Sequence, residues 1–434
     1  MCYNIHLKGI KMNDTKNTTE VYAWGEKIAT LLEHHGKIYF EAENSATLDF
    51  SPLKLTTLGT QSYSDLSFQH YLPGLISDHI PGHYGIQYMD AFFRRERGRL
   101  PSTLERLQFI GQHSIGALEF VPAVQTGISG ETVELKEMHQ MSKDALQGEH
   151  SFELATLIAI SNSAGGGARA KAHVGYNKNN GKIYVVDKHA ALPEGFRHAI
   201  VKFDEYKEGG NAFIPKLYTA NSVYTKTEYI YSLIAKRLGI NMADTFLINT
   251  EQGSHFVTHR FDQQDGQRQH LHSLSGLLHH DAGQQFSLGY EQIFRTGLAL
   301  NVPHDAMEQI YKTMIFNLVF GNRDDHSKNF SFIMNTKREW DFSPSYDLTY
   351  VINKGAGSEH QLSIANNPAS WATFNVLSKI AKTFGVSEHQ EIITNTIEAK
   401  QTMLRSLCLE HAIPKVWIEE IMTNTKSIDK SISR

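Results

Sequence analysis

The chain has 434 residues, a hydrophobic fraction of 41% and a net charge of −4. This length allows two or three domains, and the ordinary apolar fraction argues against wholesale disorder. The slight acidity argues against binding to nucleic acid through bulk charge, and no stretch approaches the length of a membrane span or a signal-peptide core. Two cysteines, Cys2 and Cys408, lie too far apart in sequence to indicate a disulfide framework. We therefore expect a cytoplasmic enzyme.

The first 148 residues are predicted to form a small α/β module. Residues 1–20 are polar and expected to be disordered, and Met12 is a candidate second start. The apolar pattern predicts strands at 36–42 and 116–122, and a short helix at 104–110 between them. Residues 123–148 are polar and rich in Glu, Lys and Gln, so they are the best candidate for a domain boundary.

A glycine-rich run, Gly165 to Gly167, follows this boundary. Consecutive glycines leave backbone N–H groups unshielded, so that they can wrap around an anion. The run is not a Walker loop, because Ala170 precedes Lys171 where that loop requires glycine. A hairpin with an Asn-Gly turn at 180–181 is predicted next. A glycine loop that enters a hairpin is typical of kinases rather than dinucleotide-binding folds; a flexible surface loop is the alternative.

A strand is predicted at 198–203, and Lys202 near its end stands where a kinase places the lysine that pairs with phosphates. An amphipathic helix is predicted at 227–239, and Gly239 is predicted to end it. Glu228 lies in the first turn of this predicted helix. It could pair with Lys202 or complement the helix dipole, and we favour the dipole.

Two further strands, 245–249 and 255–262, are predicted to be joined by a turn that contains Gly253. In a kinase-like lobe the second strand leads into the connection between the lobes. The backbone from His259 to Phe261 could then form hydrogen bonds with an adenine. Residues 263–290 are rich in Gly and Gln, and we predict that they form loops.

The strongest signal for function comes from the segment that follows a predicted helix from Ala306. Gly321 ends this helix as a left-handed cap would, and Asp324 and Asn329 follow with four residues between them. A second acid, Asp347, comes in a later segment. An acid, an amide five positions later and a second acid form the minimal polar set of a protein-kinase-like phosphotransferase. The alternative is a polar loop at a helix end, since Asp, Asn and Ser are common turn residues.

The remainder of the chain is predicted to be helical, with two apolar stripes that we assign to the core. The members of these stripes are Trp371, Phe374, Leu377 and Ile380, and then Ile393, Ile397, Leu404 and Leu407.

Taken in this order, the pieces resemble the HipA family of serine/threonine protein kinases, which act as toxins of bacterial toxin–antitoxin pairs. The resemblance runs from about Tyr22 to beyond Leu407. It is strongest at 163–171, 260–262, 321–330 and 344–347, and residues 72–75 and 111–117 resemble the N-terminal subdomain of the family. It implies an α+β, two-lobed, protein-kinase-like fold. The implied parts are a small N-terminal α/β subdomain at 1–148, a kinase N-lobe at 149–262 and a mainly helical C-lobe at 263–434.

The resemblance also implies roles for single residues. Asp324 matches the catalytic Asp, Asn329 and Asp347 match the magnesium ligands, and Lys202 matches the lysine that contacts the nucleotide phosphates. The other residues implied to bind ATP are Gly165, Gly166, Gly167, Ala168, Arg169, Lys171, His259, Arg260, Phe261, His326, Lys328 and Tyr346. The implied cofactors are ATP and Mg²⁺.

The family also suggests how such a kinase is controlled. Members autophosphorylate a serine in or beside the glycine-rich loop, which switches the kinase off; here Ser163 and Ser161 both qualify. The implied partners are a helix-turn-helix antitoxin like HipB and a protein substrate on the translation machinery, such as an aminoacyl-tRNA synthetase. DNA would be contacted only through the antitoxin, and no membrane is involved.

One departure from the family pattern concerns the catalytic base. Asp325 stands where many members have a small residue, so that two adjacent acids compete for this role. We favour Asp324, because its spacing to Asn329 is the expected one. Two other functions stay open: a small-molecule kinase of similar fold, and a pseudokinase that serves as a corepressor.

Overall fold

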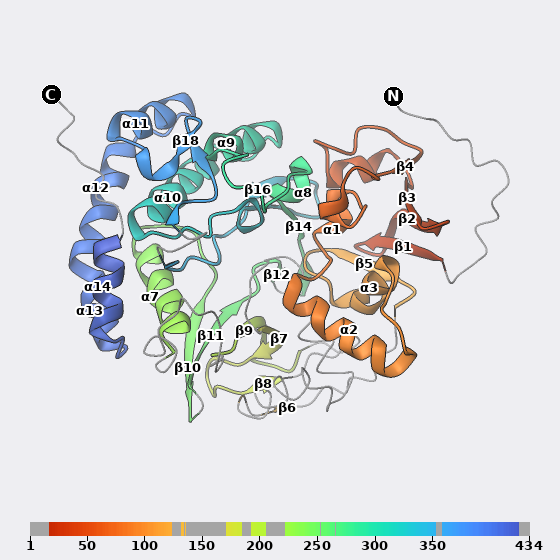
Figure 1. The fold of residues 1–434 in the computed structure, drawn as a ribbon, viewed down its shortest axis with the longest axis horizontal. Helices are drawn as coiled ribbons and strands as arrows, with labels where there is room; N and C mark the ends of the chain where they lie inside the picture. The colour runs from red at the N-terminus through yellow and green to blue at the C-terminus, as the bar shows by residue number, and fades with distance from the viewer. Residues whose placement is uncertain are drawn as a thin grey trace. The chain divides into compact units, whose positions relative to one another are not determined.

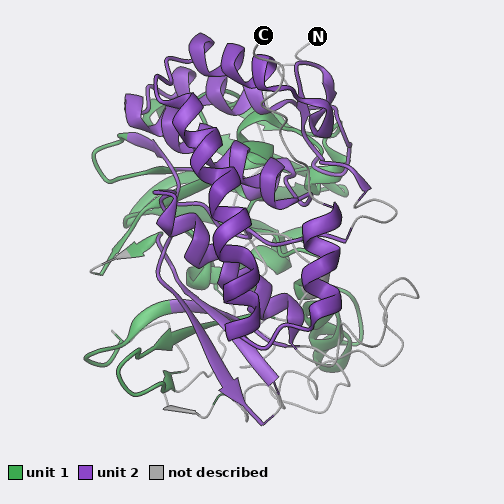
Figure 2. Cartoon of the chain, turned by 90° about the vertical axis from the view of Figure 1, so that its left-hand side faces the viewer, with its two compact units in different colours: residues 1–198, 262–281, 333–339 green, residues 199–261, 282–332, 340–434 purple. Residues whose placement is uncertain are grey.

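The computed structural model describes residues 17–123, 132–133, 135, 171–184, 192–204, 222–251, 253–264, 266–352 and 358–424 (Figure 1). The chain forms two compact units, and both are discontinuous in sequence (Figure 2). Unit 1 contains 1–198, 262–281 and 333–339, and unit 2 contains 199–261, 282–332 and 340–434. The domain boundaries expected at 148 and 262 stay a prediction. No helix in the described ranges is long and apolar enough to cross a membrane.

Unit 1 is built on an antiparallel five-stranded sheet with the strand order β4-β3-β2-β1-β5. The strands are β1 (Thr18–Ala23), β2 (Glu26–His34), β3 (Lys37–Ala42), β4 (Thr60–Ser62) and β5 (Leu118–Val121). The two-residue turn between β2 and β3 has positive φ at both His35 and Gly36, as a tight hairpin turn requires. The strands predicted at 36–42 and 116–122 are therefore confirmed. The expected disorder reaches too far, because β1 begins at Thr18.

Helices and short strands complete unit 1. They are η1 (Ser45–Phe50), η2 (Ser67–Gln69), α1 (Gly74–Ser77), α2 (His83–Arg97), α3 (Thr103–Ile110), η3 (Gly111–His113), β6 (Thr132–Val133), β7 (Lys171–Tyr176) and β8 (Ile183–Tyr184). The predicted helix α3 starts at a capping box, in which Ser102 and Glu105 satisfy each other's backbone N–H groups. Strands β7 and β8 form the predicted hairpin, and Gly181 in its turn has a φ of 71°.

The loops that the sequence predicted at 263–290 are confirmed only after Leu278, because the earlier part of this segment forms short strands and a helix. This earlier part contains β12 (Gln263–Gln264), β13 (Gln267–Arg268), β14 (His270–Ser273) and α8 (Leu274–Leu278). Tertiary contacts fix the part of this polar segment up to Asp281 within unit 1. The Arg268 guanidinium donates to the Glu119 carboxylate at 2.8 Å, and Asp78 accepts hydrogen bonds from His272 and Ser273. Contacts between residues this far apart in sequence leave no local periodicity to detect.

A buried histidine in unit 1 gives a prediction for pH dependence. His79 is 2% exposed, and its ring packs edge-on against Phe120. Burial lowers the pKa of His79 from 6.5 to about 3. Between pH 6.5 and 3, His79 is therefore protonated in the unfolded chain but stays neutral in the folded chain. The folded state loses stability relative to the unfolded state as the pH falls through this range.

In wild type, His79 should make the free energy of unfolding fall as the pH is lowered from 6.5 to 4. We expect this slope to be smaller in His79→Leu than in wild type, by up to about 1.4 kcal/mol per pH unit. Urea denaturation at a series of pH values measures this slope. His304, which is exposed at the start of α10, supplies the control His304→Gln, which replaces a histidine outside the buried core. Equal slopes for wild type and His79→Leu would contradict the assignment.

The strands and the first helix of unit 2 match the predicted kinase-like core. The elements are β9 (Arg197–Lys202), α7 (Val223–Arg237), β10 (Thr245–Thr250) and β11 (Gly253–His259). Strand β11 lies between β10 and β9 and is antiparallel to both, with Lys202 opposite Phe256. Helix α7 packs against β10 and β11 (Figure 1). Trp417 anchors α7 further, because its Nε1 donates to Thr227 Oγ1 at 2.9 Å.

The remainder of unit 2 is mainly helical, as predicted. It contains α9 (Tyr290–Ala299), α10 (His304–Phe320), η4 (Ser327–Asn329), β15 (Ser331–Met334), β16 (Trp340–Phe342), β17 (Ser363–Ile364), β18 (Asn367–Pro368), η6 (Ala369–Trp371), α11 (Phe374–Thr383), α12 (His389–Ala399), the π-helix η7 (Lys400–Leu404), α13 (Arg405–Glu410) and α14 (Lys415–Asn424). Helix α10 contacts α9, α12 and β16 and is buried over most of its length, so it forms the centre of this unit.

The two predicted core stripes need correction at four positions. Trp371 is 68% exposed, because it lies in the short helix η6 before α11 begins, where the helical period no longer applies. Phe374, Ile397 and Leu407 are half-buried. The π-helix between α12 and α13 adds residues to one turn and rotates the following face, so that Cys408 is buried in place of Leu407.

Candidate active site

The loop that follows α10 is held at its start by buried groups. Gly321 has a φ of 66° and caps α10 in the left-handed conformation that the sequence predicted. Tyr231 of α7 donates its hydroxyl to the Phe320 carbonyl at 2.7 Å. Asn322 Nδ2 donates to Asn317 Oδ1, one turn from the end of α10, at 3.0 Å. The residues after Asn322 therefore leave the helix in a fixed direction.

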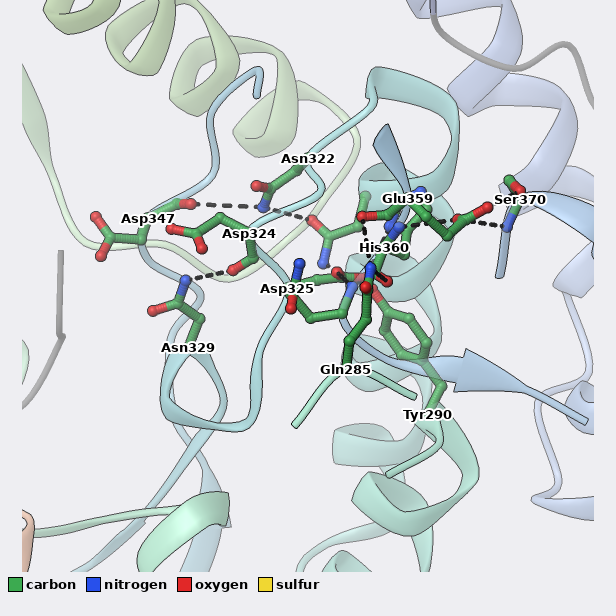
Figure 3. A network of polar contacts seen from close by, with 12 residues as sticks. Gln285, Tyr290, Asn322, Asp324, Asp325, Asn329, Asp347, Glu359, His360 and Ser370 are labelled. Atoms are coloured by element: carbon green, nitrogen blue, oxygen red, sulfur yellow. Dashed lines mark hydrogen bonds and ion pairs between the residues drawn. The ribbon is translucent and has the colours of Figure 1, made fainter. Parts of the chain in front are cut away.

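The side chains of Asp324, Asn329 and Asp347 point to the same side of this loop (Figure 3). Asn329 Nδ2 donates to the Asp324 carbonyl at 2.6 Å, which turns Asn329 Oδ1 the other way. Among the described residues, this buried oxygen has no hydrogen-bond partner. An amide oxygen together with the Asp347 carboxylate is a donor set that suits Mg²⁺, which prefers oxygen ligands. The residues present therefore fit the expected metal.

Lys202 links Asp347 to helix α7. Its Nζ lies 2.6 Å from Glu228 Oε1 and also contacts Asp347 Oδ1. The three side chains are 12%, 7% and 16% exposed, so the ammonium compensates two largely buried carboxylates. Our preference for a helix-dipole role of Glu228 is wrong. Helix α7 begins at Val223, which puts Glu228 beyond its first turn and opposite Lys202.

The segment that carries Asp347 is fixed by two contacts of the preceding Ser345. Its backbone N–H donates to the Asn241 carbonyl at 2.8 Å, and its hydroxyl lies 2.9 Å from Thr313 Oγ1 of α10. Asp347 itself has a φ of 55°, in the left-handed region that aspartate enters more readily than most side chains. The chain therefore turns sharply at the position where it presents this carboxylate.

Asp324 and Asp325 lie in opposite environments (Figure 3). The Asp325 side chain is fully buried, and both of its oxygens are engaged. Oδ2 accepts from the Tyr290 hydroxyl at 2.6 Å and faces His360 Nδ1 at 2.8 Å, while Oδ1 accepts from the Gln361 N–H at 2.7 Å. The Asp324 side chain is 49% exposed. This difference supports Asp324 over Asp325 as the group that reaches a substrate.

Four of the residues expected to bind ATP lie in or around this loop. His326 Nε2 is 3.5 Å from Asp324 Oδ1. The Tyr346 hydroxyl donates to the Lys328 carbonyl at 2.8 Å, and its ring stacks on Phe261 with centroids 5.9 Å apart. The stacked pair ties the end of the β11 segment to the segment of Asp347.

The other expected contacts are less direct or fall outside the described residues. The His259 N–H already donates to the Asp244 carbonyl, so a backbone contact with adenine at this residue is left to its carbonyl. Arg260 is buried, and Lys171 is buried at the start of β7 in unit 1. The structure does not describe the glycine-rich loop or the two candidate serines: Ser161, Ser163, Gly165, Gly166, Gly167, Ala168 and Arg169.

Comparison with known proteins identifies the family. Residues 163–404 match the HipA-like C-terminal domain, and residues 19–121 match the HipA N-terminal domain. This chain belongs to the HipA family. A relative in this family, the serine/threonine-protein kinase toxin HipA of Shewanella oneidensis, is 22% identical over 63% of this chain and 61% of its own length. A putative kinase of Haemophilus influenzae is 26% identical over 34% of this chain and 48% of its own length.

The fold is also that of a solved HipA structure. The complex of Shewanella oneidensis HipA, HipB and operator DNA matches with a TM-score of 0.62 and 18% identity, covering 95% of this chain and 92% of that one. The predicted α+β, HipA-like kinase fold is therefore confirmed. The sequence alignments span less than two thirds of the length of either of these two relatives.

Sequence reasoning missed the partners of Asp325. Tyr290 and His360 lie 35 residues before and after it, in elements with no shared period. The one indication in the sequence was that Asp325 is an aspartate where many family members have a small residue.

Proposed function

We propose that this chain is an ATP-dependent serine/threonine protein kinase that acts as a toxin and is neutralised by an antitoxin. The observation that carries the proposal is the shared orientation of Asp324, Asn329 and Asp347, with Lys202 joining Asp347 to Glu228. Phosphoryl transfer consists mostly of positioning and charge neutralisation, and these residues supply both.

In the proposed reaction, Asp324 accepts a hydrogen bond from the acceptor hydroxyl and takes its proton. The hydroxyl oxygen forms a bond to the γ-phosphorus, and the bond from that phosphorus to the ADP oxygen breaks. Lys202 pairs with nucleotide phosphates while Glu228 holds its ammonium in place. Asn329 Oδ1 and the Asp347 carboxylate would hold Mg²⁺, which neutralises charge on the phosphates.

The proposed substrate is a serine or threonine of a translation protein such as an aminoacyl-tRNA synthetase. The proposed partner is a helix-turn-helix antitoxin; the related Shewanella oneidensis HipA forms a complex with HipB and operator DNA. DNA would then be reached through the antitoxin, and the kinase would work in the cytoplasm. Autophosphorylation at Ser161 or Ser163 would switch it off.

Incubation with γ-labelled ATP tests the proposal. We expect label on protein and, by mass spectrometry of the full chain, a phosphate on Ser161 or Ser163 that increases with ATP. Ser161→Ala and Ser163→Ala, each alone, identify the modified serine. Label in a soluble small molecule would indicate a small-molecule kinase instead. Antitoxin binding without ATP turnover would indicate a pseudokinase that acts as a corepressor.

A further inference from the structure

A line of buried polar side chains runs through unit 2 behind the candidate active site (Figure 3). We name it the Asp325 chain. Its members, in order of contact, are His360, Asp325, Tyr290, Asn317, Asn322 and the backbone carbonyl of Asp347. All five side chains belong to residues that are no more than 3% exposed. Buried polar groups cost free energy unless they are paired, so the hydrogen bonds along this line are needed to keep its members in the core.

The donors and acceptors in this chain have one consistent direction. Asp325 accepts hydrogen bonds, so the Tyr290 hydroxyl donates to it at 2.6 Å. That hydroxyl oxygen then accepts from Asn317 Nδ2 at 3.1 Å. Asn317 Oδ1 in turn accepts from Asn322 Nδ2 at 3.0 Å. Burial and the nearby Asp325 carboxylate raise the pKa of Tyr290 well above its usual value, which keeps this hydroxyl protonated.

The chain ends on the proposed metal ligand. Asn322 Nδ2 also lies 3.4 Å from the carbonyl oxygen of Asp347, the longest link in the series. Asp347 is in the left-handed backbone conformation, which needs support from its surroundings. The orientation of the Asn322 amide is set by Asn317, and that of Asn317 by Tyr290. The Tyr290 hydroxyl therefore decides whether a donor or an acceptor faces Asp347.

We propose that Tyr290 is a positioning residue, whose hydroxyl orients the Asn317 and Asn322 amides and thereby fixes the backbone of the metal ligand Asp347. This inference rests on the proposed function. Groups behind a metal ligand commonly change metal affinity by 10-fold to 100-fold when they are removed. Tyr290→Phe keeps the ring, which is fully buried, and removes only the oxygen that sets this direction.

The test compares Tyr290→Phe with Tyr311→Phe in the full chain. Tyr311 is also fully buried in unit 2, but its hydroxyl donates to the Leu377 carbonyl at 3.2 Å and takes no part in the Asp325 chain. The readout is the Mg²⁺ concentration that half-saturates the binding of a fluorescent ATP analogue. We expect it to rise about 10-fold in Tyr290→Phe and less than about twofold in Tyr311→Phe.

A second variant tests the chain from its other end. Asn322→Ala removes the donor next to Asp347, and we expect a similar rise in the half-saturating Mg²⁺ concentration. Because both changes interrupt one path, the double variant should resemble the single variants rather than show the product of their effects. The thermal midpoint without nucleotide and circular dichroism establish that each variant is folded.

The outcomes separate the inference from the function on which it rests. Mg²⁺-dependent nucleotide binding in wild type, with equal effects of Tyr290→Phe and Tyr311→Phe, would overturn the inference alone. Multiplicative effects of Tyr290→Phe and Asn322→Ala would also overturn it. A wild-type chain without Mg²⁺-dependent nucleotide binding would overturn both the proposed function and this inference.

Discussion

Asp324→Asn is expected to lower the rate of phosphoryl transfer to protein by about 10²–10⁴-fold, the usual contribution of a positioned general base. Asparagine has nearly the same shape but cannot take the proton of the acceptor hydroxyl. The Asp324 side chain is 49% exposed, and its backbone carbonyl, rather than its carboxylate, accepts from Asn329. The fold and the binding of nucleotide should therefore change little. Initial rates with γ-labelled ATP and the thermal midpoint measure the two effects.

Asp325→Asn is the matched control, because it makes the same change at the neighbouring residue. Asp325 accepts from Tyr290, His360 and Gln361 and is fully buried. An amide nitrogen at this position would face donors, and one buried group would lose its partner at a cost of about 1–3 kcal/mol. We expect lower stability from Asp325→Asn and lost catalysis from Asp324→Asn. Undiminished labelling by Asp324→Asn would rule out its assignment as the base.

The sequence was sufficient for those features that depend on local pattern. The left-handed cap at Gly321 and the hairpin turn at Gly181 follow from the conformational freedom of glycine, and both are present. The spacing of Asp324 and Asn329 predicted one polar site, and in the structure the Asn329 amide donates to the Asp324 carbonyl at 2.6 Å. Local chemistry therefore predicted the centre of the candidate site.

The features that the sequence could not predict depend on contacts between distant residues. For Glu228 the sequence left pairing with Lys202 and a helix-dipole role both open, and the dipole was favoured because the start of α7 at Val223 was not evident and Lys202 lies 26 residues away. The burial of Asp325 depends on Tyr290 and His360, each 35 residues distant. Trp371 fits a helical stripe in sequence and lies outside the helix in space. Periodicity reports which face of an element is apolar, but not which residue approaches it from another element.

Lys202→Met is expected to reduce both stability and activity, because it removes the cation between two carboxylates. Glu228 and Asp347 are only 7% and 16% exposed. Breaking a buried ion pair by removing one partner commonly costs about 3–5 kcal/mol, since the remaining charge stays buried without compensation. Methionine preserves an unbranched stem in the same space, so the loss reports the charge and not a cavity. Urea denaturation measures the change in the free energy of unfolding.

A control lysine separates this effect from the general loss of a surface charge. Lys312 Nζ lies 2.6 Å from Glu308 Oε1 on helix α10, and Glu308 is 37% exposed. The Lys312 side chain is 19% exposed, so this pair is only partly solvated, and for Lys312→Met we expect a loss of about 1 kcal/mol, well below that for Lys202→Met. A similar loss in both variants would contradict the special role of Lys202.

The double variant Lys202→Met with Glu228→Gln then separates the contribution of Lys202 to stability from its contribution to catalysis. Neutralising Glu228 removes one of the two uncompensated carboxylates, so part of the lost stability should return. Activity should not return, because the phosphates still lack their ammonium partner. Mg²⁺ should raise the thermal midpoint of Lys202→Met more than that of wild type, since a cation bound at Asp347 replaces the missing charge. If the double variant recovered transfer of label to protein, Lys202 would serve only to neutralise Glu228, and its proposed contact with nucleotide would be wrong.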